Sequence, residues 1–112
     1  MTILTALDQA RVWRALADLA ETTPGLPATR IVVEGHITLA AQLTVEIGAH
    51  GEPEVFEAWR VALGISPESL ERRRLMGGSW VTSGHTISHG IAWIVSLYHR
   101  QPAPALALAG AA

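Results

Sequence analysis

Two stretches of alternating apolar and polar residues dominate the hydrophobic pattern of the chain. In residues 37–47 every second position is apolar, and a second alternating run covers residues 87–98. Successive side chains of a β-strand point to opposite faces, so this alternation predicts two strands that each bury one face. Residues 30–34 and 80–83 are rich in β-branched or aromatic side chains and precede the two runs. We expect each of them to be a partner strand.

Two other segments repeat apolar residues at helical spacing. The first segment covers residues 4–21, and near its start Thr5 and Asp8 have the spacing of a capping box. Residues 53–63 begin with Pro53, which is tolerated at the first position of a helix. The apolar stripe of this second segment consists of Val55, Phe56, Trp59 and Leu63. The pattern therefore predicts two helices that each pack one stripe against the strands.

Together these elements predict an α+β fold with a four-stranded antiparallel sheet and the two main helices on one face. One further short helix is expected to begin at Ser66. A chain of 112 residues fits one domain with one core. We place this domain at residues 1–100 and expect residues 101–112, rich in proline and alanine, to form a loosely held tail.

The two halves of the chain also match each other. A shift of 50 residues places Leu43 on Trp93 and Val45 on Val95, and the helices supply further matches at slightly different offsets. This similarity predicts a duplicated α-β-β unit. The alternative is chance, because one alternating strand matches any other.

Composition narrows the possible functions. The chain has no cysteine, which excludes disulfides, thiolate metal sites and thiol nucleophiles. A formal net charge of -2 gives no general attraction for nucleic acid. The sequence shows no leader pattern and no apolar run near the roughly 20 residues of a membrane span, so we expect a cytoplasmic protein. All eight basic residues are arginine, which is typical of a bacterium with a GC-rich genome.

The segment 53–76 carries the most specific motif. Its first helix ends in Leu-Gly, and one apolar residue and a Ser-Pro helix start follow. This arrangement resembles the helix-turn-helix of bacterial DNA-binding regulators, which implies a second helix in the major groove. The resemblance implies base contacts by Ser66, Glu68 and Ser69 and phosphate contacts by Arg72, Arg73 and Arg74.

A second interpretation of the same residues remains open. Arg60 and Arg73 stand where the regulator family has a small and an apolar residue. In this interpretation the segment is a helix followed by a solvent-exposed helical turn, in which Glu68 and Arg72 form a stabilising i,i+4 pair.

Two histidines in the second strand region raise the question of a metal site or a hydrolase. His85 and His89 are four residues apart, which in a strand separates them by about 13 Å. A zinc ion held at about 2 Å by each nitrogen does not bridge that distance unless the chain bends sharply at Gly84 or Gly90. Serines lie nearby, but no nucleophile-elbow pattern occurs. We therefore assign no catalytic residue, metal ligand or cofactor, and treat an enzyme as the least supported class.

The chain contains four tryptophans, whose positions predict their roles. Trp13, Trp59 and Trp93 fall on apolar stripes and are expected in the core. Trp80 begins a strand and is a candidate for either the core or an interface. A small, apolar chain without an assembled chemical site predicts a non-catalytic interaction or regulatory module, which forms a homodimer or binds a protein partner. The alternatives are a DNA-binding regulator and, after it, a small hydrolase or metal-binding protein around His85 and His89.

Overall fold

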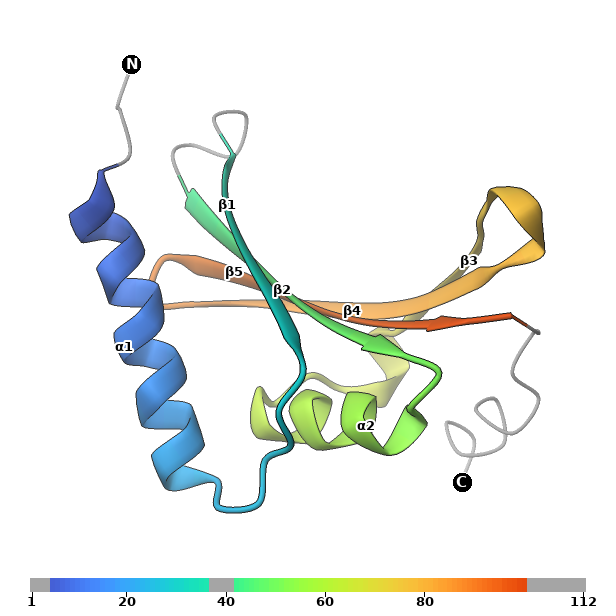
Figure 1. The fold of residues 1–112 in the computed structure, drawn as a ribbon, viewed down its shortest axis with the longest axis horizontal. Helices are drawn as coiled ribbons and strands as arrows, with labels where there is room; N and C mark the ends of the chain where they lie inside the picture. Colours follow the sequence, from blue (N-terminus) through green and yellow to red (C-terminus); the bar gives the residue numbers. More distant parts are fainter. Residues whose placement is uncertain (1–4, 37–41, 101–112) are drawn as a thin grey trace.

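The computed structural model describes residues 5–36 and 42–100, which form two helices, five strands and two single 3-10 turns (Figure 1). In chain order these elements are α1 (Ala6–Thr22), β1 (Arg30–His36), β2 (Gln42–His50), α2 (Pro53–Ala62), η2 (Pro67–Ser69), β3 (Glu71–Arg74), η3 (Met76–Gly78), β4 (Trp80–Ser88) and β5 (Ile91–His99). The predicted tail at 101–112 and the start of the first predicted strand at 37–41 lie outside the described residues. No helix in the described part of the chain is long and apolar enough to cross a membrane.

The strands form one mixed sheet in the order β1-β2-β5-β4-β3. β2 and β5 run parallel at its centre, and the other neighbouring pairs are antiparallel. The prediction of a four-stranded antiparallel sheet is therefore wrong in both strand number and direction. Alternation tells which residues share a face, but it does not tell which strand is the neighbour. A parallel pair needs a long crossover, and here α2, β3 and β4 all lie between β2 and β5 in the chain.

The fifth strand lies where the sequence predicted a second helix. Only three residues after Ser66 form a helical turn, and Leu70 is already extended, with φ -68° and ψ 139°. Residues 71–74 then pair with β4, so that Arg72 lies opposite Thr82. The free edge of β4 supplies the hydrogen bonds that a helix would have made internally. The helix-turn-helix geometry is thus not formed in this segment.

The predicted duplication finds no support in the topology. Each half contains a helix and a hairpin, and the equivalent strands β2 and β5 lie side by side and parallel. However, β1 flanks β2 on one side, β4 flanks β5 on the other, and both helices cover the same face. The two units therefore have opposite hands, and no rotation superposes them.

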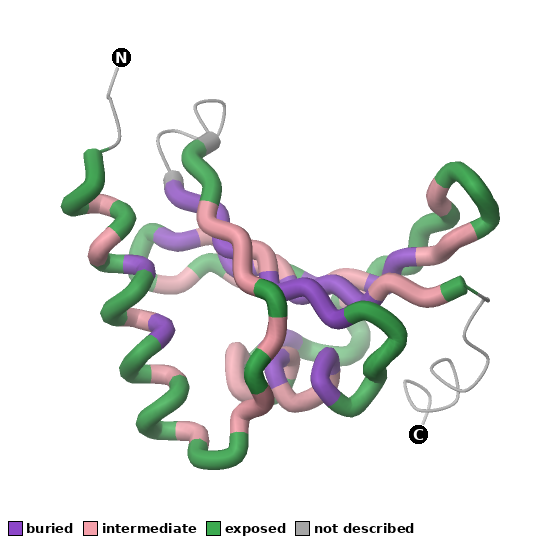
Figure 2. The backbone as a smooth tube through the Cα atoms, viewed as in Figure 1, coloured by how far each residue is buried: buried purple, intermediate pink, exposed green. Residues whose placement is uncertain are grey.

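The core lies between the helices and one face of the two central strands. Alternate residues of β2 and β5, including Val45 and Val95, are fully buried under both helices (Figure 2). α1 contributes Val12 and Leu16, and its predicted Thr5–Asp8 capping box is confirmed. α2 contributes the stripe Val55, Phe56 and Trp59.

Of the three tryptophans predicted in the core, two are buried and one is exposed. Trp59 and Trp93 are buried as expected, and the indole Nε1 of Trp59 donates a hydrogen bond to the carbonyl of Pro27 at 2.9 Å. Trp13 was expected in the core but is 54% exposed, because Val12 and Leu16 already define the buried side of α1. Trp80 is half-buried at the start of β4.

Arg60 fixes the turn that leaves α2. Its guanidinium donates two hydrogen bonds to the carboxylate of Glu57, both at 2.8 Å, and a third to the carbonyl of Ile65 at 2.7 Å. The hydrogen bond from Arg60 lowers the pKa of the Glu57 carboxyl. The arginine that departs from the helix-turn-helix pattern thus has a structural role, since it holds the chain that leads to β3.

Gly84 allows that chain to approach the sheet. A Cβ atom on Gly84 would lie 2.7 Å from both Ile65 Cγ2 and Leu70 Cδ2. Ile65 is 3% exposed and belongs to the core. The glycine is therefore needed for close packing rather than for an unusual backbone angle.

We expect Gly84→Ala to lower the free energy of unfolding by about 1–3 kcal/mol, because the added methyl group overpacks a filled site. Urea denaturation followed by circular dichroism measures the change. Gly48→Ala is the matched control in β2, where the nearest atoms to a new Cβ are 3.7 Å and 4.0 Å away. The control is expected to change the stability by less than about 0.5 kcal/mol, and equal losses in both variants would contradict the close packing.

We expect stability to fall at acidic pH partly through Glu57. The pKa of its carboxyl is lowered in the folded state, so its stabilising contribution is present above the unfolded value of 4.5 and is lost as the pH falls through the folded value. Between pH 5 and pH 3 the Tm of Glu57→Gln should drop less than that of the original chain, by roughly 1–4 °C for a half-exposed ion pair. Glu21 is an exposed residue of α1, and the Tm of Glu21→Gln should fall over this pH range as much as that of the original chain. If the Tm of all three proteins falls equally between pH 5 and pH 3, the Glu57–Arg60 pair does not contribute to the pH dependence of stability.

Candidate functional site

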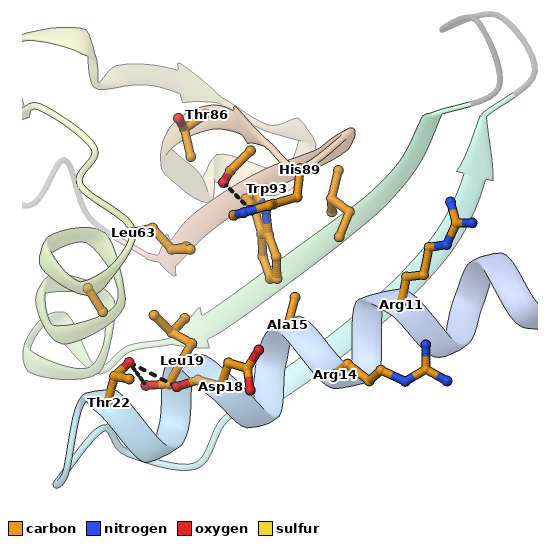
Figure 3. A pocket seen from close by; sticks show the side chains of 13 residues that line it. Arg11, Arg14, Ala15, Asp18, Leu19, Thr22, Leu63, Thr86, His89 and Trp93 are labelled. Carbon is orange, nitrogen blue, oxygen red and sulfur yellow. Dashed lines mark hydrogen bonds between the residues drawn. The ribbon is translucent and has the colours of Figure 1, made fainter.

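A pocket of about 550 Å³ opens between α1, the end of α2 and the hairpin of β4 and β5 (Figure 3). Its inner surface is apolar and includes Trp93 of β5, Leu63 near α2, and Ala15 and Leu19 of α1. In Figure 3 Trp93 points from the sheet toward α1, and Leu19 points up from the helix toward the sheet. The pocket therefore has an aromatic wall on one side and an aliphatic wall on the other.

Short side chains explain why this space stays open. α1 packs on β2 through Val12 and Leu16, whereas α2 packs nearer the opposite ends of β2 and β5. Toward the β4–β5 turn the same sheet face carries Thr86 and Ser88, which line the pocket and do not reach α1. The two helices thus diverge over a part of the sheet where β4 carries only these two short side chains.

Charged groups of α1 line the opening. Arg11, Arg14 and Asp18 all border the pocket. Arg11 lies 4.0 Å from Asp8, and its side chain is 69% exposed. The pKa of Asp8 is lowered chiefly by hydrogen bonds from Thr5, with Arg11 the smallest contributor, so this ion pair is loose. Within residues 5–36 and 42–100, Arg14 makes no ion pair, and both guanidinium groups retain donors.

His89 closes the pocket from the sheet side in an unusual backbone conformation. It is the first residue of the two-residue turn between β4 and β5, with φ +56°, and Gly90 follows with φ +73°. Positive φ at both positions is the signature of a type I′ hairpin turn. The Oγ of Ser88 and the Nδ1 of His89 are 2.8 Å apart and hydrogen-bonded. The turn directs the imidazole to the pocket side, although strand alternation from His85 would place it on the other face.

Two other cavities are less suited to a ligand. On the opposite face of the sheet a space of about 240 Å³ surrounds Glu46, Tyr98 and His50. There the Tyr98 hydroxyl donates to Glu46 at 2.9 Å, the His50 ring stacks on Tyr98, and burial raises the pKa of the Tyr98 hydroxyl. These groups already satisfy one another. A groove of about 630 Å³ beside α2 carries the acidic Glu54 and also Glu57, which is bound to Arg60.

The residues predicted to contact nucleic acid lie elsewhere. All six are exposed, and none of them lines the 550 Å³ pocket: Ser66, Glu68, Ser69, Arg72, Arg73 and Arg74. The Ser66 side chain caps η2 and hydrogen-bonds the Glu68 carboxylate. Since β3 is a strand, Arg73 points to the sheet face opposite to that of Arg72 and Arg74. The arginines therefore do not form one basic surface.

The two histidines of the metal hypothesis are separated as well. His85 is exposed on the sheet face that faces away from the helices, and His89 borders the pocket. Among the described residues no group of three or more His, Asp or Glu side chains could hold a metal ion. Trp80, the interface candidate, lies at the far end of β4 and does not border the pocket.

Two features of the sequence mark this pocket. Arg11, Ala15, Asp18 and Thr22 follow one another at intervals of three or four residues, which makes a polar and small stripe beside the apolar stripe of α1. The second feature is a His-Gly pair between two strands, where Asn-Gly or Asp-Gly is usual.

Comparisons with protein-family models, with curated proteins and with solved structures find no match to this chain. The described residues form a small α+β domain in which the 550 Å³ pocket lies between α1 and the sheet.

Proposed function

We propose that this chain is a non-catalytic binding module that holds a small apolar molecule in the pocket between α1 and the β4–β5 hairpin. The observation that carries the proposal is a cavity of about 550 Å³ with an apolar wall and a few polar groups at its mouth. Binding sites for small molecules have this composition and fall within about 300–1,000 Å³.

The walls of the pocket are firmly held, which favours binding. Trp93 is 4% exposed and Ile91 is 4% exposed, and both belong to the main core. Their positions are fixed by the pairing of β5 with β2 on one side and β4 on the other. A ligand would therefore enter a preformed space and lose little free energy to ordering of the protein.

The polar groups of the pocket are better suited to binding a ligand than to catalysing a reaction. The hydrogen bond between Ser88 and His89 joins a hydroxyl to an imidazole, but through Nδ1, whereas the serine of a catalytic triad bonds Nε2. In a catalytic triad the second ring nitrogen bonds a carboxylate that orients the base. Within the described part of the chain, Nε2 of His89 has no such partner, and the neighbouring residues share one turn rather than converging from separate elements.

DNA binding through residues 66–74 has less support than pocket binding. The expected recognition helix is replaced by η2 and β3, and the three arginines alternate between the two faces of a strand. No described element presents a basic helix that would enter a major groove.

We expect the uncharged fluorescent probe N-phenyl-1-naphthylamine to bind this pocket and to become brighter on binding. Ala15→Phe places a ring in the space above Trp93 and should weaken binding at least tenfold. Ala17→Phe is the matched control, because Ala17 is exposed on α1 and does not line the pocket. Fluorescence titration gives both dissociation constants. If the original chain does not bind the probe, or if both variants bind it equally well, the pocket is not a ligand site.

A second candidate is self-association through the sheet face that faces away from the helices. Among the described residues no helix packs on this face, and Ile87 there is 61% exposed while Ile94 is half-buried. A second copy is the simplest way to cover such a face.

We expect a dimer in size-exclusion chromatography with light scattering at tens of micromolar, and a monomer for Ile87→Glu, because the carboxylate would be desolvated at the interface. Met76→Glu is the control, since Met76 is 99% exposed but lies in η3, away from this face. A monomeric original chain would remove this candidate and leave the pocket proposal unaffected.

A further inference from the structure

We propose that the molecule bound in this pocket is an organic acid, and that its acid group is held at the mouth by Arg11 and Arg14 of α1 and by His89 of the β4–β5 turn. This inference rests on the proposed function and adds the chemical class of the ligand. It is carried by the β4–β5 turn, by the free donors around it and by the order of charges along α1.

The backbone of His89 is the first observation. In the described part of the chain, His89 is the only residue other than glycine that has a positive φ. Such a conformation costs stability for any residue with a Cβ atom, and asparagine or glycine adopts it more easily. The type I′ turn itself requires this conformation, so what distinguishes His89 is that its side chain borders the 550 Å³ pocket.

The hydrogen bond of the imidazole shows which atom faces a ligand. Ser88 Oγ occupies Nδ1 at 2.8 Å. When the serine hydroxyl donates to Nδ1, the ring proton resides on Nε2, which becomes a donor. In residues 5–36 and 42–100 no acceptor contacts Nε2, so in this tautomer Nε2 is available to donate to an oxygen atom of the bound molecule.

The arginines supply the second set of donors. Arg14 has no ion pair within the described residues, and Arg11 has only the loose 4.0 Å contact with Asp8. Guanidinium groups bind carboxylates through paired N–H donors, which makes them suited to a planar acid group. In Figure 3 both side chains extend from α1 at one end of the pocket with their guanidinium groups directed away from His89 and Trp93, so binding of a shared acid group requires them to turn toward the pocket.

Asp18 sets the direction in which the ligand lies. At 1.5 Å per residue it is about 6 Å along the helix from Arg14 and about 10 Å from Arg11. It is near the end of α1 where Leu19 and Thr22 also line the pocket. An acid group is therefore attracted to the arginine end and repelled from the Asp18 end, whereas an amine would have the opposite preference.

The apolar wall excludes an inorganic anion as the main ligand. Trp93, Leu19 and Leu63 gain nothing from a sulfate or phosphate ion, but they would bury the body of an aromatic or branched aliphatic acid. The pocket thus selects a molecule with an apolar body and one acid group.

The test uses three probes that share one apolar body: naphthalene-1-acetic acid, 2-(1-naphthyl)ethanol and 2-(1-naphthyl)ethylamine. Isothermal titration calorimetry on the full chain should show the acid binding at least tenfold more tightly than the alcohol, and the amine binding no more tightly than the alcohol. Arg14→Gln and Arg11→Gln should each weaken acid binding about five- to tenfold and leave the alcohol unchanged. Arg100→Gln, an exposed arginine that does not line the pocket, is the matched control and should change neither.

His89→Asn separates the functional role from a structural one. Asparagine followed by glycine is the preferred type I′ pair, so the turn is kept and the Tm should rise. The same variant should lose the preference for the acid over the alcohol by about fivefold or more. A variant that keeps the full acid preference would overturn the role of His89.

The results distinguish this inference from the proposed function. If the alcohol binds and the acid has no advantage, the organic-acid inference is wrong and the pocket remains a site for neutral apolar molecules. If none of the three probes binds, both proposals fail together.

Discussion

The parallel pairing of β2 with β5 is the constraint on which the rest of the structure depends. It places Val45 and Val95 on one face at the centre of the sheet, where both are fully buried. Strands in this position have neighbours on both sides, so they have no edge that must be protected. Both helices pack on the face that these two strands create, and the outer strands β1, β4 and β3 extend the sheet on either side. Loss of register between β2 and β5 would expose every residue of that face at once.

The same constraint creates the pocket. Because β1 and β4 flank the central pair on opposite sides, the helices that precede the two hairpins do not lie next to each other along their whole length. α1 is fixed to β2 by Val12 and Leu16, and α2 is fixed by its own stripe of three buried residues. The space that remains over Trp93 is bordered by the polar side of α1 and by the β4–β5 turn. The position of the pocket is thus a consequence of strand order.

Local features of the fold could be predicted from the sequence, and long-range ones could not. The capping box at Thr5, the proline start of α2 and the buried side of each central strand follow from rules that involve neighbouring residues. The direction of β5 relative to β2 depends on a crossover of some 40 residues, for which alternation carries no information. Residues 71–74 were predicted as helical because a Ser-Pro helix start precedes them at Ser66, but pairing with β4 decided their conformation. For the site, the sequence singled out His89 as a possible metal ligand, yet only the turn geometry shows that it borders a pocket with Arg11 and Arg14.

The arginines of β3 also limit how copies of this sheet can join. β3 is an edge strand of four residues, and three of them are arginine. Another strand that tried to add there would meet a short, positively charged edge, which is a common way to block sheet extension. A head-to-tail filament needs two compatible edges on every subunit, one to donate and one to accept. β3 pairs only with residues 80–83 of β4, so its arginines block strand addition along that part of the edge, while β1 forms the edge at the other side of the sheet.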